Sequence, residues 1–229
     1  MRRLSLGLRV FLLAAAVVGL AAPGRAGEFS IARIYIEYNA IPNDLGYHVS
    51  LDGEDWKSLK IVDPNGKTIF DVTGKGAYKD LGMTELFFEG AEPNLADFLL
   101  ADLLALFPEG VYTFSGVTVD GERLVSTSTL THAVPARPPA SASVNGDTVV
   151  ISWSHVTSPP AGFPNRPIVI SGYQILADSF QVTLPASATQ VTLPIEFVQW
   201  LAPGAHPFEV LAIEVGGNQT ITEGTYVTE

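Results

Sequence analysis

The chain has 229 residues, of which 47% are hydrophobic, 10% aromatic and 16% charged. This composition is typical of a folded protein and excludes a chain that is disordered throughout. The formal net charge is −11 at pH 7, and a chain this acidic is repelled by nucleic acids and by anionic lipid surfaces. We therefore exclude nucleic-acid binding. Acidity also simply keeps a protein soluble, so it identifies no partner.

Residues 1–26 have the pattern of an export signal. Arginines precede the apolar run Val10–Ala22, and Pro23 and small residues at a potential cleavage site follow it. A membrane-spanning helix needs about 20 apolar residues, whereas this run has 13. We predict that the segment is cleaved, which leaves a secreted or periplasmic protein without a stable membrane anchor.

Removing this segment changes the charge of the remaining chain. The four ionisable residues of the segment are all arginines, so the net charge becomes about −15. The chain has no cysteine, and its fold must therefore depend on a hydrophobic core without disulfides. The remaining length, about 200 residues, is enough for two domains of ordinary size.

One linker divides the chain after the export signal. Three prolines occur within the six residues Val134–Pro139, which favours an extended, semi-rigid connector. We therefore predict a first domain over residues 27–134, a linker over 135–139 and a second domain over 140–229.

The first domain is predicted to be a β-sandwich. Alternating apolar residues indicate a half-buried strand over residues 31–38. Two later pairs of apolar runs flank Asp-Pro-Asn-Gly and Asp-Gly sequences, which are typical turns of hairpins. The strands of these two hairpins are expected at residues 59–62, 68–72, 111–119 and 123–130.

One segment of the first domain has helical periodicity instead. From Asn94 to Leu106 the apolar residues recur at helical spacing, and Pro108 follows. Asn94 is a suitable N-cap, and proline marks the end of a helix. We predict one short helix packed against the first sandwich.

The second domain is predicted to contain only strands and turns. Six short strands with regularly spaced turn signals are typical of an immunoglobulin-like sandwich. They are expected at residues 148–153, 172–177, 181–184, 189–193, 207–215 and 221–227. The predicted fold class is therefore all-β, with two tandem β-sandwich domains.

Four stretches of the second half resemble a fibronectin type III domain over Arg137–Glu229. They are Val149–Trp153 with its core tryptophan, Ile170–Ile175 with a tyrosine that packs on it, Leu201–Gly204 at a corner, and Phe208–Glu214 with Gly217-Asn218. Phe208 stands near the place of the corner tyrosine of that family. Either the hydrogen bond of that tyrosine is absent, at a cost of about 0.5–1.5 kcal/mol, or Pro207 shifts the spacing by one residue. The resemblance implies a non-catalytic module for adhesion, spacing or ligand binding. The first half resembles segments that precede such modules in exported bacterial proteins, which implies no activity.

Motifs for catalysis do not occur in this sequence. It lacks the G-x-S-x-G and H-E-x-x-H patterns. Gly74-Lys75-Gly76 begins like a dinucleotide-binding loop, but Lys79 replaces the third glycine, so we interpret it as a turn with no helix after it. We interpret the four histidines as structural or solvated, because no two lie at ligand spacing. They are His48, His132, His155 and His206. We predict no catalytic residue and no organic cofactor.

The first domain contains one cluster of oxygen-bearing side chains that suits a cation. Its members are Glu37, Asn39, Asp44, His48, Asp52, Glu54 and Asp55. Ca²⁺ takes 6–8 oxygen ligands, so we predict a calcium site at Asp44, Asp52, Glu54 and Asp55, with solvated turns as the alternative. A second acidic stretch contains Glu85, Glu89 and Glu92. It either pairs with this cluster or brackets a core strand, and we favour the second interpretation.

Apolar residues of the second domain predict an interaction surface. Leu176, Leu211 and Ile213 point outward if the alternate residues of their strands face the core. Three aliphatic side chains on one solvent face exceed scattered exposure, although the first domain could simply cover them. The proline-rich loop 154–167 with Phe163 is a second candidate, because rigid loops at sandwich ends often bind ligands.

These features favour a secreted, non-catalytic binding or interaction protein, at the cell surface or in the periplasm, with a protein or glycan ligand. One alternative is a structural spacer in an extracellular assembly. Another is a hydrolase that uses two carboxylates of the first domain, as glycosidases do. The sequence indicates neither a specific ligand nor an oligomeric state.

Overall fold

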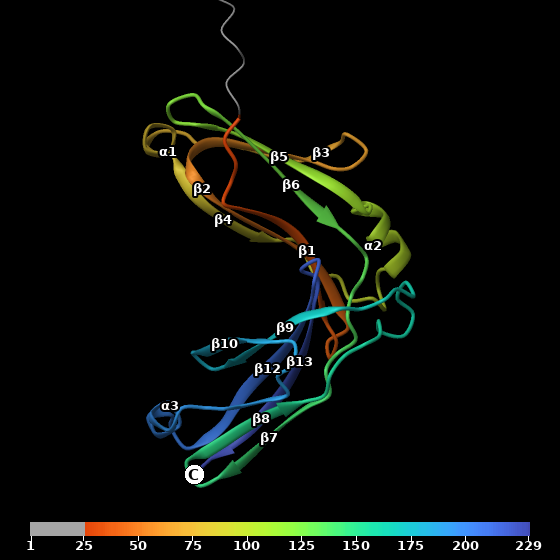
Figure 1. Ribbon diagram of the computed structural model, residues 1–229, viewed down its shortest axis with the longest axis vertical. Helices are drawn as coiled ribbons and strands as arrows, with labels where there is room; N and C mark the ends of the chain where they lie inside the picture. The colour runs from red at the N-terminus through yellow and green to blue at the C-terminus, as the bar shows by residue number, and fades with distance from the viewer. Residues whose placement is uncertain (1–25) are drawn as a thin grey trace, which may run out of the picture.

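The computed structural model describes residues 26–229 (Figure 1). The predicted export signal lies outside the described residues, apart from Ala26. Among the residues that are described, no helix is long and apolar enough to cross a membrane.

The fold is all-β, as the sequence predicts, and the described chain contains thirteen strands and three short helices. The strands of the first half are β1 (Ile31–Asn39), β2 (Asp44–Val62), β3 (Thr68–Thr73), β4 (Met83–Glu89), β5 (Gly110–Thr118) and β6 (Arg123–Leu130). Those of the second half are β7 (Ala140–Asn145), β8 (Thr148–Trp153), β9 (Ile170–Ala177), β10 (Phe180–Pro185), β11 (Gln190–Thr192), β12 (Gly204–Glu214) and β13 (Gln219–Thr228). The helices are α1 (Ala77–Leu81), α2 (Leu100–Leu106) and α3 (Ile195–Trp200).

The first half is organised around β2, which is 19 residues long. Its first part pairs with β1 and β4, and its last part pairs with β3 and β5. The register shifts near Trp56, where β2 passes from one layer to the other. Figure 1 shows β5 and β6 across from β1 and β4. The core between these layers includes Ile34, Ile36, Trp56 and Phe114, each at most 1% exposed.

The turn chemistry read from the sequence is confirmed between β2 and β3. Asp63 Oδ1 accepts hydrogen bonds from the backbone N–H groups of Asn65 (2.9 Å) and Lys67 (2.7 Å). Gly66 has a φ of 82°, a conformation that glycine adopts at little cost. The local sequence thus favours the turn of this hairpin.

The helix predicted over Asn94–Leu106 is wrong in its first half, because α2 begins at Leu100. Asn94 does not cap it. The Asn94 Nδ2 group donates to the Pro42 carbonyl (2.6 Å) and its Oδ1 accepts from the Ala96 N–H (2.9 Å), so Asn94 closes a turn beside β2. A second correction concerns the glycine-rich loop, since the five-residue helix α1 follows Gly76 where no helix was expected.

The second half is a sandwich of two sheets, in the orders β11–β8–β7 and β10–β9–β12–β13. Trp153 and Tyr173 pack in its core with ring centroids 5.5 Å apart, which confirms the contact expected from the sequence. Phe208 is also buried, and its ring lies over Gly224, where a Cβ atom would come within 2.2 Å of it. A glycine is therefore required at position 224.

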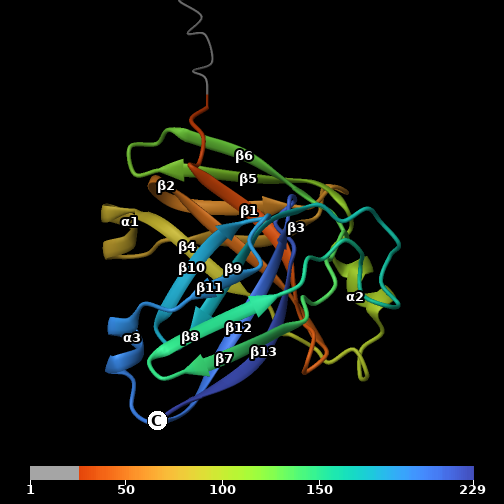
Figure 2. The same cartoon turned by 60° about the horizontal axis from the view of Figure 1, so that its bottom comes forward.

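The two halves share one sheet. β1 pairs in parallel with β13, from Glu37 opposite Gln219 to Asn39 opposite Ile221, and Figure 2 shows the two strands at the junction. The resulting ten-stranded sheet carries both cores on the same face. We call the opposite face the outer face; one row across it contains Ile213, Gln219, Glu37 and Gly46.

The amide of Asn218 connects the halves at this junction. Its side chain is buried at 1% exposure. Oδ1 accepts from the N–H of Ile36 (2.9 Å), and Nδ2 donates to the carbonyls of Thr131 (2.8 Å) and Ala133 (3.2 Å). The Thr220 hydroxyl also donates to the Pro135 carbonyl, so the linker is not a free connector, and Val134 just before it is fully buried.

We predict that Asn218→Ala lowers the free energy of unfolding by about 2–4 kcal/mol, because it leaves buried backbone groups of both halves without partners. Urea unfolding followed by tryptophan fluorescence measures this change. Asn165→Ala, in an exposed loop, is the control and should change stability by less than about 0.5 kcal/mol. Equal effects of the two substitutions would contradict the role of Asn218.

Candidate metal centre

Three potential metal ligands from separate segments meet on the outer face of the sheet. Glu37 lies on β1, His48 on β2, and Glu92 in the segment after β4. One ligand atom from each lies within 4.8 Å of the others. His48 Nε2 is 3.6 Å from Glu37 Oε1 and 3.7 Å from Glu92 Oε1. In the part of the chain that the structure describes, this is the one such group of three.

Strand register explains how these side chains come together. Glu37 pairs with Gly46 across β1 and β2, and His48 lies two residues further along the same face of β2. Gly46 makes room for Glu92, since a Cβ atom at Gly46 would lie 2.7 Å from Cγ of Glu92. The missing side chain at position 46 thus lets Glu92 lie over the sheet beside His48.

The imidazole of His48 is buried without any hydrogen-bond partner. The residue is 3% exposed, and its ring contacts those of Tyr35 (centroids 5.1 Å apart) and Phe87 (5.7 Å). Neither ring nitrogen has a hydrogen-bond partner, and 3.6–3.7 Å to the carboxylates is too long for one. Buried polar atoms are normally satisfied, so this arrangement points to a missing partner between the three groups.

The two carboxylates are held in place by their other oxygen atoms. Glu37 Oε2 accepts from Gln219 Nε2, and Glu92 Oε2 accepts from Asn39 Nδ2 (3.2 Å). The Oε1 atom of each carboxylate is thereby directed toward His48, and that of Glu92 is buried without a partner. Hydrogen bonds of this kind commonly orient the carboxylates of metal sites.

Acidic groups crowd this part of the outer face. Burial raises the pKa of Glu92, and the nearby charges of Glu89, Glu37 and Asp44 raise it further. His48 lowers this pKa. A bound cation would relieve the same repulsion.

The donor set suits a divalent transition metal. One imidazole nitrogen with two carboxylate oxygens is typical of Zn²⁺ or Mn²⁺ sites, whereas Ca²⁺ prefers oxygen alone. In a tetrahedral site with bonds of about 2.1 Å, the ligand atoms lie roughly 3.4 Å apart. The observed 3.6 and 3.7 Å are close to this spacing. Three protein ligands leave one position for water or another ligand.

The structure does not bring together the four residues predicted to bind calcium. Asp44 and Asp52 both lie on β2, eight residues and therefore roughly 27 Å apart, so they cannot share one ion. Asp44 alone lies near the metal-ligand group, opposite Asn39. Asp52 pairs instead with Ile31 and with Glu85 of β4.

Two interpretations of single residues in this region also change. Glu92 pairs with the first acidic cluster, which is the alternative that we did not favour. His48 is not solvated but lies between the two glutamates. Glu37 and His48 were part of the cluster recognised in the sequence, but nothing in the sequence around Glu92 indicated that it would fold over Gly46.

The predicted apolar surface is partly buried. Leu211 is 4% exposed, so its expected exposure to solvent is wrong, while Leu176 and Ile213 are half-buried. Leu211 lies in one row of the sheet with Ile221, which in turn pairs with Asn39 of the first half. This burial agrees with the alternative that the first domain covers these residues.

Phe163 lies at the junction between the halves. Its ring centroid is 4.8 Å from that of Tyr38, and the side chain packs against the first core. In the same loop, Arg166 forms an ion pair with Glu109 of the first half. The loop 154–167 therefore holds the two halves together.

The remaining histidines with described contacts differ from His48. His206 has partners on both sides, with Asp178 Oδ2 at 3.1 Å from Nδ1 and the Ala202 carbonyl at 2.8 Å from Nε2. His132 Nε2 lies 2.9 Å from the Phe107 carbonyl. These contacts agree with the structural role expected from the sequence.

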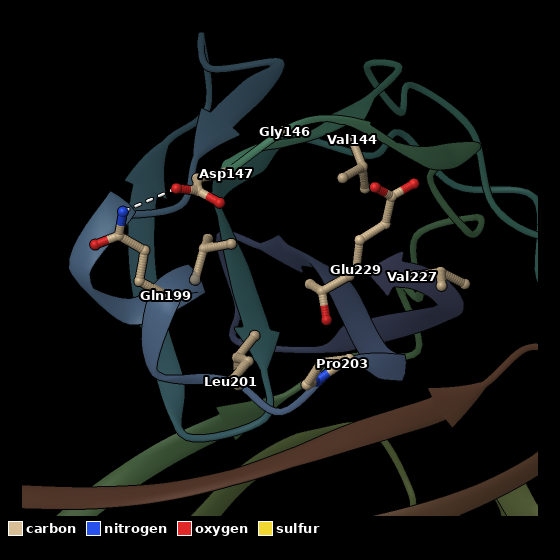
Figure 3. A pocket seen from close by; sticks show the side chains of 10 residues that line it. Val144, Gly146, Asp147, Gln199, Leu201, Pro203, Val227 and Glu229 are labelled. Carbon is tan, nitrogen blue, oxygen red and sulfur yellow. Dashed lines mark hydrogen bonds between the residues drawn. The ribbon is translucent and has the colours of Figure 1, made fainter.

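Two hollows can be compared with the metal-ligand group. Neither is lined by Glu37 or His48, although Glu92 lines one of them. One, of about 630 Å³, opens at the end of the second sandwich, where Gln199 Nε2 donates to Asp147 Oδ2 at 2.8 Å (Figure 3). The other, of about 450 Å³, has an apolar lining that includes Tyr47, Leu103 and Phe107, with Glu92 at its edge. Neither gathers a set of catalytic groups.

No protein-family model and no curated protein matches this sequence. Among solved structures, the spore cortex lytic enzyme SleM of Clostridium perfringens is 17% identical, with 41% of this chain and 28% of that chain covered and a TM-score of 0.33. The BSP domain of a biofilm-associated protein is also 17% identical (87% and 30% covered, TM-score 0.26). The lipoprotein Tp47 of Treponema pallidum is 10% identical (86% and 50% covered, TM-score 0.32). This chain spans at most half of each of these structures, and the similarity assigns it no function.

We predict that Leu211→Glu lowers the free energy of unfolding by about 3 kcal/mol or more, because it places an unpaired charge at a buried position. Thermal and urea unfolding measure the change. Val215→Glu, at a residue 62% exposed just after β12, is the control and should have little effect. A stable Leu211→Glu variant would show that this part of the outer face is open to solvent.

The acidic groups of the outer face also predict that the stability of the fold depends on pH through Glu209, which lies on the outer face of β12. Burial raises its pKa above the ordinary 4.5, and Glu223 and then Glu37 add to the shift. A raised pKa in the folded state means that the ionised form of Glu209 destabilises the fold. This cost disappears as the pH falls below the pKa that the group has in the unfolded chain. Glu209→Gln should therefore increase stability at pH 7, on the order of 0.5 kcal/mol.

Urea unfolding between pH 7 and pH 4 tests this expectation. The difference in the free energy of unfolding between Glu209→Gln and the parent chain should shrink as the pH falls toward 4. Glu196→Gln, at an exposed position of α3, controls for the change in net charge. A difference that stays constant with pH would show that the ionisation of Glu209 is not its cause.

Proposed function

We propose that this chain is an exported, non-catalytic binding module whose first domain holds one divalent metal ion at Glu37, His48 and Glu92. The observation that carries the metal site is the imidazole of His48. It is 3% exposed, lacks any hydrogen bond, and directs Nε2 toward two carboxylate oxygens.

The ion would supply a positive charge that no residue of the cluster provides. Nε2 of neutral His48 and the Oε1 atoms of the two glutamates would donate to it, while Gln219 and Asn39 hold the other carboxylate oxygens. Such an ion would cross-link β1, β2 and the segment after β4. In a chain without cysteine, a metal can stabilise the folded state as a disulfide does in other exported proteins.

The topology of the second half supports a binding or display role. Its three-stranded sheet β11–β8–β7 packs against the four strands β10–β9–β12–β13, with Trp153 and Tyr173 between them. This arrangement supports the resemblance to fibronectin type III modules, whose known roles are adhesion, spacing and ligand binding. A protein or glycan at the cell surface or in the periplasm is the proposed partner.

One observation favours a second candidate function, a hydrolase. Burial raises the pKa of Glu92, and a second carboxylate, Glu37, lies in the same cluster, as a hydrolase that uses two carboxylates would require. Screening against polysaccharides tests this alternative. Turnover that is independent of metal and is lost in both Glu37→Gln and Glu92→Gln would replace the metal-binding proposal.

We predict that the chelator-treated protein, without its predicted export signal, binds one Zn²⁺ per chain in a calorimetric titration, with Mn²⁺ weaker and Ca²⁺ weakest. His48→Ala removes the nitrogen ligand and should lower the Zn²⁺ affinity by about 100-fold or more. His155→Ala, at an exposed histidine, should leave it unchanged.

The rival explanation of the cluster is an ion pair in which His48 carries a proton between the two glutamates. Nitrogen-detected NMR at pH 7 distinguishes the two. The metal site requires a neutral imidazole whose Nε2 signal shifts on addition of Zn²⁺. No heat, no retained Zn²⁺ after dialysis and a doubly protonated ring would sink the proposal.

A further inference from the structure

The Glu37 carboxylate belongs to the metal-ligand group and to the junction between the two halves. Its Oε1 atom lies near His48 Nε2, while its Oε2 atom accepts a hydrogen bond from Gln219 of β13. Glu37 and Gln219 are also register partners where the parallel pairing of β1 and β13 begins. A single carboxylate therefore connects a ligand position in the first half to the first paired residue of the second.

The backbone pairing across this junction is short compared with the strand pairing inside each half. The β1–β13 pairing contains three registered pairs, whereas β12 and β13 have ten within the second half. Other links include the Asn218 amide, the hydrogen bond from the Ala40 N–H to the Ile221 carbonyl, and the contact of Phe163 with Tyr38. Among these links, the hydrogen bond of Glu37 with Gln219 is the one that also involves a residue of the metal-ligand group.

Charge on the outer face opposes closure of the junction when no ion is bound. On the first half, the charges of Glu89, Glu37 and Asp44 act on Glu92. In the second half, Glu37 acts on Glu209, after the larger effects of burial and Glu223. A dication at Glu37 would offset the charge of this carboxylate that acts across the junction.

We infer that the metal ion acts as a clamp, which fixes the second domain against the first through the Glu37 carboxylate that both share. This inference rests on the proposed metal site. Binding of the ion holds Glu37 in the orientation in which Oε2 faces Gln219, and it removes repulsion from Glu209. Loss of the ion loosens the β1–β13 pairing, so the angle between the halves becomes variable.

Distances between spin labels test the clamp directly. Because the chain has no cysteine, Thr127→Cys on β6 and Ser143→Cys on β7, both exposed, place one label on each half. Double electron–electron resonance is recorded after chelation and again with saturating Zn²⁺. We expect a broad distance distribution that becomes narrow when the ion binds.

Gln219→Ala separates the clamp from the metal site. It keeps all three ligands, and losing the hydrogen bond to Glu37 should weaken Zn²⁺ binding by about 10–100-fold, so Zn²⁺ is again added to saturation. We expect this variant to bind the ion without the narrowing. Gln174→Ala is the matched control, since Gln174 bonds Thr183 within the second half, and it should behave like the parent chain.

Each outcome of this experiment is decisive. Narrowing in the parent chain and in Gln174→Ala, but not in Gln219→Ala, supports the clamp. If dialysis shows bound Zn²⁺ but the distribution is unchanged, the clamp is wrong and the proposed metal site stands. If no Zn²⁺ is retained by the parent chain, both proposals fail. Narrowing that persists in saturated Gln219→Ala would overturn the clamp, because the hydrogen bond of Glu37 with Gln219 would then not be what fixes the junction.

Discussion

The parallel pairing of β1 with β13 is the constraint on which the rest of the molecule depends. It forms between residues 182 positions apart in the chain, and Asn218 stabilises it by bonding both the backbone of β1 and the carbonyls of Thr131 and Ala133 after β6. Because of this pairing, both cores lie on one face of a single sheet. The opposite face then collects Glu37, Gln219 and Leu211, which would otherwise belong to separate surfaces.

That arrangement explains why the acidic groups are informative. Placing several carboxylates around a buried imidazole is unfavourable unless a positive charge compensates them. The described contacts of Glu37 and Glu92 leave one oxygen of each directed at His48. A divalent ion satisfies the nitrogen and both oxygens together, which a proton shared at 3.6–3.7 Å does not. The metal site therefore accounts for burial, geometry and charge with one assumption.

The same geometry affects how rigidly the two halves are held relative to each other. A module that displays a binding surface works best when its parts are rigid relative to each other, since flexibility must be lost when a partner binds. The β1–β13 pairing is short, and loop 154–167 of the second half adds contacts with the first half. An ion shared with Glu37 would add rigidity at the point where backbone pairing is sparse, and it would make that rigidity depend on the supply of metal.

Several features of the fold follow from the chemistry of neighbouring residues in the chain. The all-β class, the hairpin at Asp63–Gly66 and the contact of Trp153 with Tyr173 followed from alternation, turn chemistry and a family resemblance, and the structure agrees with each. Glu37 and His48 both belong to the oxygen-rich cluster seen in the sequence, but neither is among the four residues predicted there to bind calcium. The helix start at Leu100 was missed, because Asn94 hydrogen-bonds across to Pro42 instead of capping.

Which distant residues meet depends on long-range packing. Glu92 joins His48 because Gly46 leaves space above the sheet, and the segment around Glu92 has no periodicity that would reveal this. Leu211 is buried because β12 belongs to a sheet that continues into the first half. In both cases the deciding contact is long-range, and local propensity carries no information about which partner a strand edge or a carboxylate will find.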